Sequence, residues 1–293
     1  MLPVMLHHFE LRTIIASGGM GTVYVARDMK LERDVALKMM KREMAADQEV
    51  MQAFYREARA GAALNHTNII HIYSFDEFNS QPFLVMELAD QGSLDSRIET
   101  EGRVPELDVL DVGIKMASAL ATALKHNLLH RDIKPGNILF NTEGEPKLID
   151  FGLVRAAEVE SAWEEHVWGT PHYVAPEKVE RKGEDFLSDM YSLGATMYHA
   201  MTGHFPFDAP TEQEIVSAQV YTPLTPPNQV APDITESTSN AIARAMEKRP
   251  AERFQTYEEF RMALEEARSR VLIQQVHEAS HGGHTGKSWW KKK

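Results

Sequence analysis

The chain has 293 residues, and 43% of them are hydrophobic, which is enough to bury a core in one large domain or in two modest lobes. Acidic residues outnumber Lys and Arg by 43 to 31, so we exclude a sequence-independent grip on nucleic acid as a main function. The absence of cysteine removes disulfides, thiolate nucleophiles and cysteine-based zinc sites. It fits a reducing compartment, and we expect a cytoplasmic protein.

The N-terminal part of the sequence predicts a small β-rich lobe. Residues 1–8 are expected to form an N-terminal extension, and residues 9–88 a sheet with one helix. Short β-rich runs read ELRTIIA, TVYVAR and DVALKMM. Residues 47–64 predict the helix, because apolar residues recur there at helical spacing. These residues are Val50, Phe54, Ala58 and Ala62.

Long helical patterns follow the run PFLVMEL, so residues 89–270 predict a larger, mostly helical lobe. One pattern passes through Leu110, Ile114 and Ala117. The proline-rich residues 221–233 are expected to be a loop. The two lobes together place the chain in the α+β class.

The last helix is expected to begin at Thr256, which forms a capping box with Glu259, and to end near Arg270. Residues 271–293 are then a flexible tail, which we interpret as a juxtamembrane segment. No run of about 18 apolar residues predicts a membrane span within the chain. The final WWKKK is typical of the cytosolic flank of a span, so we expect membrane association through a span beyond Lys293.

Two charged residues stand where apolar side chains are expected. Glu57 lies seven residues before Leu64, on the stripe of the predicted helix that faces the core. Lys38 lies inside an apolar strand, on the same face as Ala36 and Met40. If the two pair, the lysine is aimed and kept charged, as a phosphate clamp requires. The alternative is a lysine that extends to solvent from an edge strand and a glutamate at the margin of the stripe.

A glycine-rich turn at residues 16–21 joins two predicted strands. Glycines let backbone N–H groups approach an anion, as they do over nucleotide phosphates. Because a strand follows the turn, it is not a dinucleotide-binding fingerprint. A plain hairpin turn is the alternative.

Four motifs carry a family resemblance, in the family's order and spacing. Residues 130–137, HRDIKPGN, resemble the HRDxKxxN catalytic loop of eukaryotic-type protein kinases. Residues 150–152 resemble DFG, residues 175–177 resemble APE, and residues 35–38, VALK, resemble VAIK. The chain looks most like the bacterial branch of serine/threonine kinases. The resemblance implies a bilobal fold, with a small antiparallel sheet in the N-lobe and a larger helical C-lobe.

The resemblance implies an active serine/threonine kinase that transfers the γ-phosphate of ATP to protein hydroxyls. Asp132 would accept the proton of the substrate hydroxyl, and Lys134 would reach the transferred phosphate. Lys38 would contact the α- and β-phosphates, with Glu57 orienting it. A nucleotide-binding pseudokinase is the first alternative, and a small-molecule kinase is the second.

The resemblance also implies ATP and magnesium as cofactors. Asn137 and Asp150 would hold two magnesium ions, with manganese as a substitute. The implied adenine pocket consists of Val23, Ala36, Met86, Glu87, Ala89 and Leu139. The implied phosphate loop consists of Ala16, Ser17, Gly18, Gly19, Met20 and Gly21.

Further matches imply structural roles. Asp189 would accept hydrogen bonds from the catalytic-loop backbone, and we also interpret it as a helix cap. Glu177 and Arg253 resemble a buried ion pair behind the substrate platform. Thr170 would help to shape the substrate pocket.

The chain departs from the family pattern at three places. Ala16 replaces the first glycine of the loop, which is tolerable where φ is negative. Gly61, inside the predicted helix, either makes that helix mobile or fits a crowded contact. By resemblance, Arg131 would bind a phosphate on a threonine of the segment between Asp150 and Glu177. Here Ser161 is the only hydroxyl residue between Asp150 and Thr170 that could carry such a phosphate. Our hypothesis gives that role to phosphorylated Ser161 or to a nearby carboxylate. The candidate carboxylates are Glu158, Glu160, Glu164 and Glu165.

Overall fold

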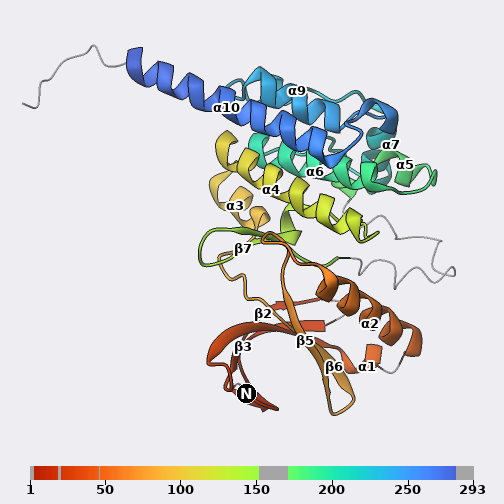
Figure 1. Cartoon of the computed structure of the whole chain (residues 1–293). Coiled ribbons are helices and arrows are strands. Elements are labelled where there is room, and N and C mark those ends of the chain that lie inside the picture. The colour runs from red at the N-terminus through yellow and green to blue at the C-terminus, as the bar shows by residue number, and fades with distance from the viewer. Residues whose placement is uncertain (1–2, 19–20, 46, 152–170, 282–293) are drawn as a thin grey trace, which may run out of the picture.

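The computed structural model describes residues 3–18, 21–45, 47–151 and 171–281 and has two lobes stacked end to end (Figure 1). Only the backbone is described for residues 49, 53, 56, 57 and 278–281. A β-sheet dominates the lobe formed by the N-terminal part of the chain, and helices dominate the other. The predicted α+β class and bilobal arrangement are confirmed.

The N-terminal lobe is built on one antiparallel sheet, in the order β1-β2-β3-β4-β6-β5. Its strands are β1 (Val4–Leu6), β2 (Phe9–Ser17), β3 (Gly21–Asp28), β4 (Arg33–Met40), β5 (Ile72–Phe78) and β6 (Gln81–Met86). Because strand side chains alternate between faces, the sheet has an apolar cluster on each side. Val35 and Leu37 pack with Phe83 on one face. Met40 packs with Phe54 of the neighbouring helix on the other.

Residues 4–6, which we expected in an N-terminal extension, belong to this sheet. β1 pairs with β2, and Leu6 lies opposite Phe9. Both side chains are buried in the same apolar cluster. A strand of three residues is too short for its alternation to stand out in the sequence.

Two helices cover the sheet face that carries Met40: α1 (Arg42–Ala45) and α2 (Gln48–Ala63). α2 is the helix predicted at residues 47–64. A Cβ added to Gly61 of α2 would lie 2.6 Å from Cδ1 of Ile72, on β5. This distance supports the interpretation of Gly61 as a small residue at a crowded contact.

The C-terminal lobe is mostly helical. Its helices are α3 (Leu94–Glu101), α4 (Glu106–Lys125), η1 (Pro135–Asn137), η3 (Pro171–Tyr173), α5 (Pro176–Val179), α6 (Phe186–Thr202), α7 (Glu212–Tyr221), α8 (Pro227–Val230), α9 (Glu236–Ala245), η4 (Pro250–Glu252) and α10 (Tyr257–His281). A short hairpin, β7 (Ile138–Phe140) with β8 (Pro146–Leu148), lies at the boundary with the sheet lobe (Figure 1). Of the proline-rich residues 221–233, which were predicted to be a loop, Tyr221 ends α7 and residues 227–230 form α8, and the others are irregular.

Helix α6 is the centre of this lobe, since nearly every side chain along it is buried. It begins at the N-cap Asp185, whose carboxylate accepts the amide of Leu187 at 2.8 Å. Asp189 lies inside the helix, so our interpretation of Asp189 as the cap is wrong. Gly203 ends the helix in the left-handed conformation that glycine tolerates.

The last helix begins as predicted, because the amide of Glu259 donates to Oγ1 of Thr256 at 3.0 Å. It continues to His281 and does not end near Arg270. Residues 271–281 contain neither glycine nor proline, so no residue stops the helix. Residues 282–293 lie outside the described part of the chain. None of the described helices is long and apolar enough to cross a membrane.

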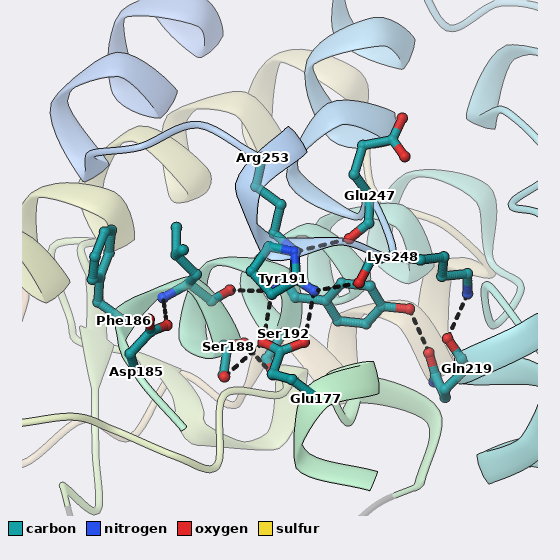
Figure 2. Close-up of polar contacts among 12 residues, drawn as sticks. Glu177, Asp185, Phe186, Ser188, Tyr191, Ser192, Gln219, Glu247, Lys248 and Arg253 are labelled. Atoms are coloured by element: carbon teal, nitrogen blue, oxygen red, sulfur yellow. Dashed lines mark hydrogen bonds and ion pairs between the residues drawn. The ribbon is translucent and has the colours of Figure 1, made fainter. Parts of the chain in front are cut away.

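A buried ion pair joins the segment after η3 to the segment before α10 (Figure 2). Both terminal nitrogens of Arg253 donate to the carboxylate of Glu177 at 2.7 Å. Arg253 also donates to the carbonyl of Leu187, and Ser188 donates to Glu177. Burial opposes ionisation of Glu177, but these hydrogen bonds outweigh it and lower the pKa of Glu177. The predicted pair is therefore present and its charges are compensated.

We predict that Arg253→Met lowers the free energy of unfolding by about 3–5 kcal/mol, because it leaves a buried carboxylate unpaired. Thermal and urea unfolding measure this change. Arg270→Ala is the matched control, since it breaks an exposed pair with Glu266 and should cost at most about 1 kcal/mol. Equal losses of stability in Arg253→Met and Arg270→Ala would contradict the assignment of a buried pair.

The stabilisation by the pair of Glu177 and Arg253 is present above the ordinary carboxyl pKa of 4.5, and it is lost as the pH falls through the lowered pKa of Glu177.

Candidate functional site

A cavity of about 420 Å³ lies between the two lobes. Apolar side chains from both lobes line it, among them Val23 and Ala36 of the sheet and Leu139 of β7. Its charged lining residues are Lys38, Glu87, Asp90 and Asp150, of which Lys38 and Asp150 come from opposite lobes. The predicted site residues in its lining are Ala16, Val23, Ala36, Lys38, Met86, Glu87, Ala89, Leu139 and Asp150.

The β2–β3 turn borders this cavity. The amide of Gly18 donates to the carbonyl of Gly21 at 2.9 Å, which closes the turn. Ser17 ends β2, and its hydroxyl lies 3.4 Å from that of Thr22. Ala16 is not among the described residues with positive φ, so the alanine is accommodated without backbone strain. Gly19 and Met20 lie outside the described residues.

Lys38 pairs with Asp150 across the cavity. Its Nζ lies 2.7 Å from Oδ1 of Asp150, and its side chain is only 12% exposed. The pair therefore links β4 to the segment after β8. The side chain of Glu57, the predicted partner of Lys38, lies outside the described residues, so that pairing remains a prediction.

Three polar residues of the predicted catalytic loop meet at one carboxylate. Nδ2 of Asn137 donates to the Oδ2 of Asp132 at 2.9 Å and to its backbone carbonyl at 2.7 Å. Nζ of Lys134 lies 2.8 Å from the same Oδ2. The carboxylate of Asp132 is thus oriented by two donors. It keeps a side-chain exposure of 26%, so a ligand can approach it.

Asp189 of α6 is hydrogen-bonded to the backbone of this loop. Its carboxylate accepts the amides of His130 and Arg131 at 2.7 Å each, as predicted. Burial raises the pKa of Asp189, while His130 and the two amide bonds oppose that rise. The ring of His130 also lies 2.8 Å from the carbonyl of Ile149, next to Asp150. Asp189 therefore holds the catalytic loop directly, and the segment before Asp150 contacts that loop through His130.

Comparison with known families assigns the chain. The model of the protein kinase domain matches residues 9–266. The chain belongs to the protein kinase family.

Named relatives and a solved structure agree with this assignment. The chain is 33% identical to serine/threonine-protein kinase PknB of Mycobacterium leprae, over 89% of this chain and 43% of PknB. It is 37% identical to serine/threonine-protein kinase PknL of Mycobacterium tuberculosis, over 82% of this chain and 60% of PknL. The chain thus spans only part of the length of these relatives. The crystal structure of a mutant of the Mycobacterium tuberculosis PknI kinase domain superposes with a TM-score of 0.68 at 26% identity, covering 90% of this chain and 97% of that one.

An ion pair between Glu87 and Lys147 holds the linker between the lobes of this kinase domain. Nζ of Lys147, on β8, lies 2.5 Å from Oε1 of Glu87. The amide of Glu87 donates to the carbonyl of His71 at 2.8 Å. Lys147 is buried, so the side chain of Glu87 is fixed on the side of the linker that faces β8. The sequence did not indicate this contact, because Lys147 lies in a strand of three residues without a charged pattern.

Asn137 and Asp150 offer the donors that magnesium prefers. Asn137 uses its Nδ2 for Asp132, which leaves its amide oxygen for a ligand. Asp150 uses Oδ1 for Lys38, and its side chain is 36% exposed. Magnesium is commonly held by one or two carboxylates together with substrate phosphates, so the two residues fit such an ion. Among the described residues, no cluster of three or more His, Cys, Asp or Glu forms a metal cage.

Several lining residues were missed from the sequence. They are Ile15, Ile70, Asp90, Gly92, Ser93, Ser96, Gly136 and Ile149. Ile15 and Ile149 each adjoin a predicted site residue and could have been found by extending the motifs by one position. Ile70 comes from a loop that carries no motif. Thr170 and Ser161 lie outside the described residues, so the predictions for them stay open.

We predict that Gly21→Ala destabilises the sheet lobe, because a Cβ there would lie 2.3 Å from the backbone carbonyl oxygen of Met39. Overpacking of this kind costs about 1–3 kcal/mol. Gly18→Ala is the control, since a Cβ at Gly18 meets no atom within 4 Å. Thermal unfolding of both variants measures the difference. If Gly18→Ala lost as much stability as Gly21→Ala, the steric explanation would be wrong.

Proposed function

We propose that this chain is the catalytic domain of an active serine/threonine protein kinase, which transfers the γ-phosphoryl group of ATP to a protein hydroxyl. Two observations carry the proposal: Lys38 and Asp150 pair across one cavity between the lobes, and Asn137 and Lys134 orient Asp132 in the loop whose Gly136 lines the same cavity. A cavity of about 420 Å³ is within the usual range of about 300–1,000 Å³ for small-ligand sites.

The nucleotide would bind with its adenine between the apolar side chains of the two lobes. Val23 and Ala36 would cover one side of the ring, and Leu139 the other. Met86 would close the back of the pocket, and the backbone of residues 87–89 would hydrogen-bond the ring. The triphosphate would extend toward Lys38 and the turn at residues 16–21, where positive charge and backbone amides stabilise anions.

In the transfer step, the substrate hydroxyl oxygen forms a bond to the γ-phosphorus and the bond from that phosphorus to the β,γ-bridging oxygen breaks. ADP leaves, and the hydroxyl proton passes to Asp132. Asn137 and Lys134 orient the carboxylate of Asp132, which places its oxygen for this proton. Lys134 would neutralise charge on the transferred group.

Magnesium, as two ions or with manganese as a substitute, would be held by Asn137 and Asp150 and would neutralise charge on the phosphates. Lys38 now shares Oδ1 of Asp150. We propose that Lys38 turns to the α- and β-phosphates when the nucleotide binds, with Glu57 as its partner. Binding of the nucleotide and binding of the metal would therefore depend on each other.

The segment of residues 171–177, which we call the substrate platform, is held in place by several contacts, and this favours a protein substrate over a small molecule. Gln219 of α7 donates to the carbonyl of Pro171 at 3.0 Å, and Ser192 donates to the carbonyl of Tyr173 at 2.8 Å. Arg253 fixes the following Glu177. A small substrate needs no such platform. The presence of every polar motif residue in the sequence likewise favours an active enzyme over a pseudokinase.

We predict that the purified chain, with radiolabelled ATP and magnesium, phosphorylates a basic test protein on serine or threonine. Asp132→Asn should lower kcat by about 100-fold or more, because it removes the proton acceptor. Thermal unfolding and nucleotide binding should stay close to wild type, which separates lost chemistry from lost folding. Equal phosphate incorporation by wild type and Asp132→Asn would rule out the enzymatic role assigned to this site.

We also propose that the domain is cytoplasmic and associates with a membrane through its C-terminal end, on the basis of the residues WWKKK at 289–293. The full chain is then expected to sediment with vesicles that contain anionic lipid. Replacing the three terminal lysines with glutamate should abolish this sedimentation. Failure of the unmodified chain to sediment in low salt contradicts the proposed surface contact.

A further inference from the structure

The loop between α5 and α6 reaches back to the catalytic loop through one carboxylate. Oε1 of Glu184 lies 2.8 Å from Nζ of Lys178, and its Oε2 lies 3.6 Å from Nε of Arg131. Glu184 thus bridges two cations from different segments. All three side chains are about one-fifth exposed, so water screens these charges only in part.

Arg131 is held by its backbone as well as by its side chain. Its amide donates to Asp189, and its carbonyl accepts Nζ of Lys178 at 3.4 Å. Its φ is 69°, in the left-handed region that a side chain makes unfavourable. Such a conformation persists only where surrounding contacts hold it. Because Arg131 directly precedes Asp132, these contacts also fix the direction in which the backbone enters Asp132.

Removing the charge of Glu184 would leave both cations without a described anion. Among the residues that the structure describes, Arg131 and Lys178 have ion pairs with Glu184 alone. Two uncompensated positive charges would then face each other, and the contact of Lys178 with the carbonyl of Arg131 would weaken.

We propose that Glu184 is a positioning residue: with Lys178 it holds Arg131 in its left-handed conformation and so keeps Asp132 in place for proton transfer. The inference rests on the proposed kinase function. It assigns the anion that meets Arg131 to the loop before α6, and not to a phosphate on Ser161.

The test compares Glu184→Gln with Glu180→Gln. Glu180 is an exposed residue of the same loop that pairs with Lys182, so the control removes the same charge without touching Arg131. A misplacement of about 1 Å can cost on the order of 100-fold in rate, and we expect Glu184→Gln to lower kcat about tenfold or more. The KM for ATP should stay within about twofold, because Glu184 lies outside the nucleotide cavity.

Three further arms distinguish positioning from a general loss of structure. Glu184→Asp, which keeps the charge, should restore part of kcat. The double variant Glu184→Gln with Lys178→Met should lose about threefold less than the product of the two single losses, since the residues act as one unit. Ser161→Ala should match wild type. Thermal unfolding reports whether each variant is folded.

A kcat of Glu184→Gln equal to that of Glu180→Gln overturns the proposal, and so does a tenfold loss in Ser161→Ala. If wild type is no more active than Asp132→Asn, the proposed function fails instead. In that case, amide hydrogen exchange over residues 129–134 still tests the inference. Faster exchange in Glu184→Gln than in Glu180→Gln supports the inference, and equal exchange overturns it.

Discussion

Two hydrogen bonds of 2.7 Å, from the amides of His130 and Arg131 to the carboxylate of Asp189, fix the catalytic loop to α6, a helix whose side chains are nearly all buried. A carboxylate that is 3% exposed can be kept there only if it is hydrogen-bonded, and the two amides meet that requirement. The same bonds help to hold Arg131 in a backbone conformation that is otherwise unfavourable. The geometry of the site therefore depends on the stability of α6.

The substrate side of the lobe depends on α6 in the same way. Glu177 is held by Arg253 and by Ser188 of α6, and the buried Tyr191 donates to Gln219 (Figure 2). Gln219 in turn donates to the carbonyl of Pro171. These contacts come from residues far apart in sequence, so only the packed lobe brings them together. Removal of one partner of the buried pair would leave the other as an unpaired charge inside the packed lobe.

The motif residues and the two lobes could be predicted because periodicity and motif spacing are local properties of the sequence. Contacts that depend on lobe packing could not. Lys38 was expected to need an anion, but that Asp150 supplies one follows from how the lobes meet. Asp189 was found with its correct hydrogen bonds, yet the cap of α6 is Asp185, because either aspartate fits the local pattern. Glu184 carries no motif, and its significance follows from its distance to Arg131 alone.

The segment that leads into Asp150 is hydrogen-bonded on one side to the stretch before β5 and on the other to the catalytic loop, which fixes this aspartate at the boundary between the lobes. The amide of Ile70 donates to the carbonyl of Leu148 at 3.0 Å, and the amide of Leu148 donates to Asn68 at 2.8 Å. On the other side, the amide of Ile149 donates to the carbonyl of Asn137 at 3.1 Å. Ile69, between Asn68 and Ile70, packs in the core of the helical lobe, so the stretch before β5 belongs with that lobe. The two proposed metal ligands, Asn137 and Asp150, are therefore tied together by the backbone of one lobe, whereas Lys38 comes from the sheet and reaches Asp150 through its side chain alone.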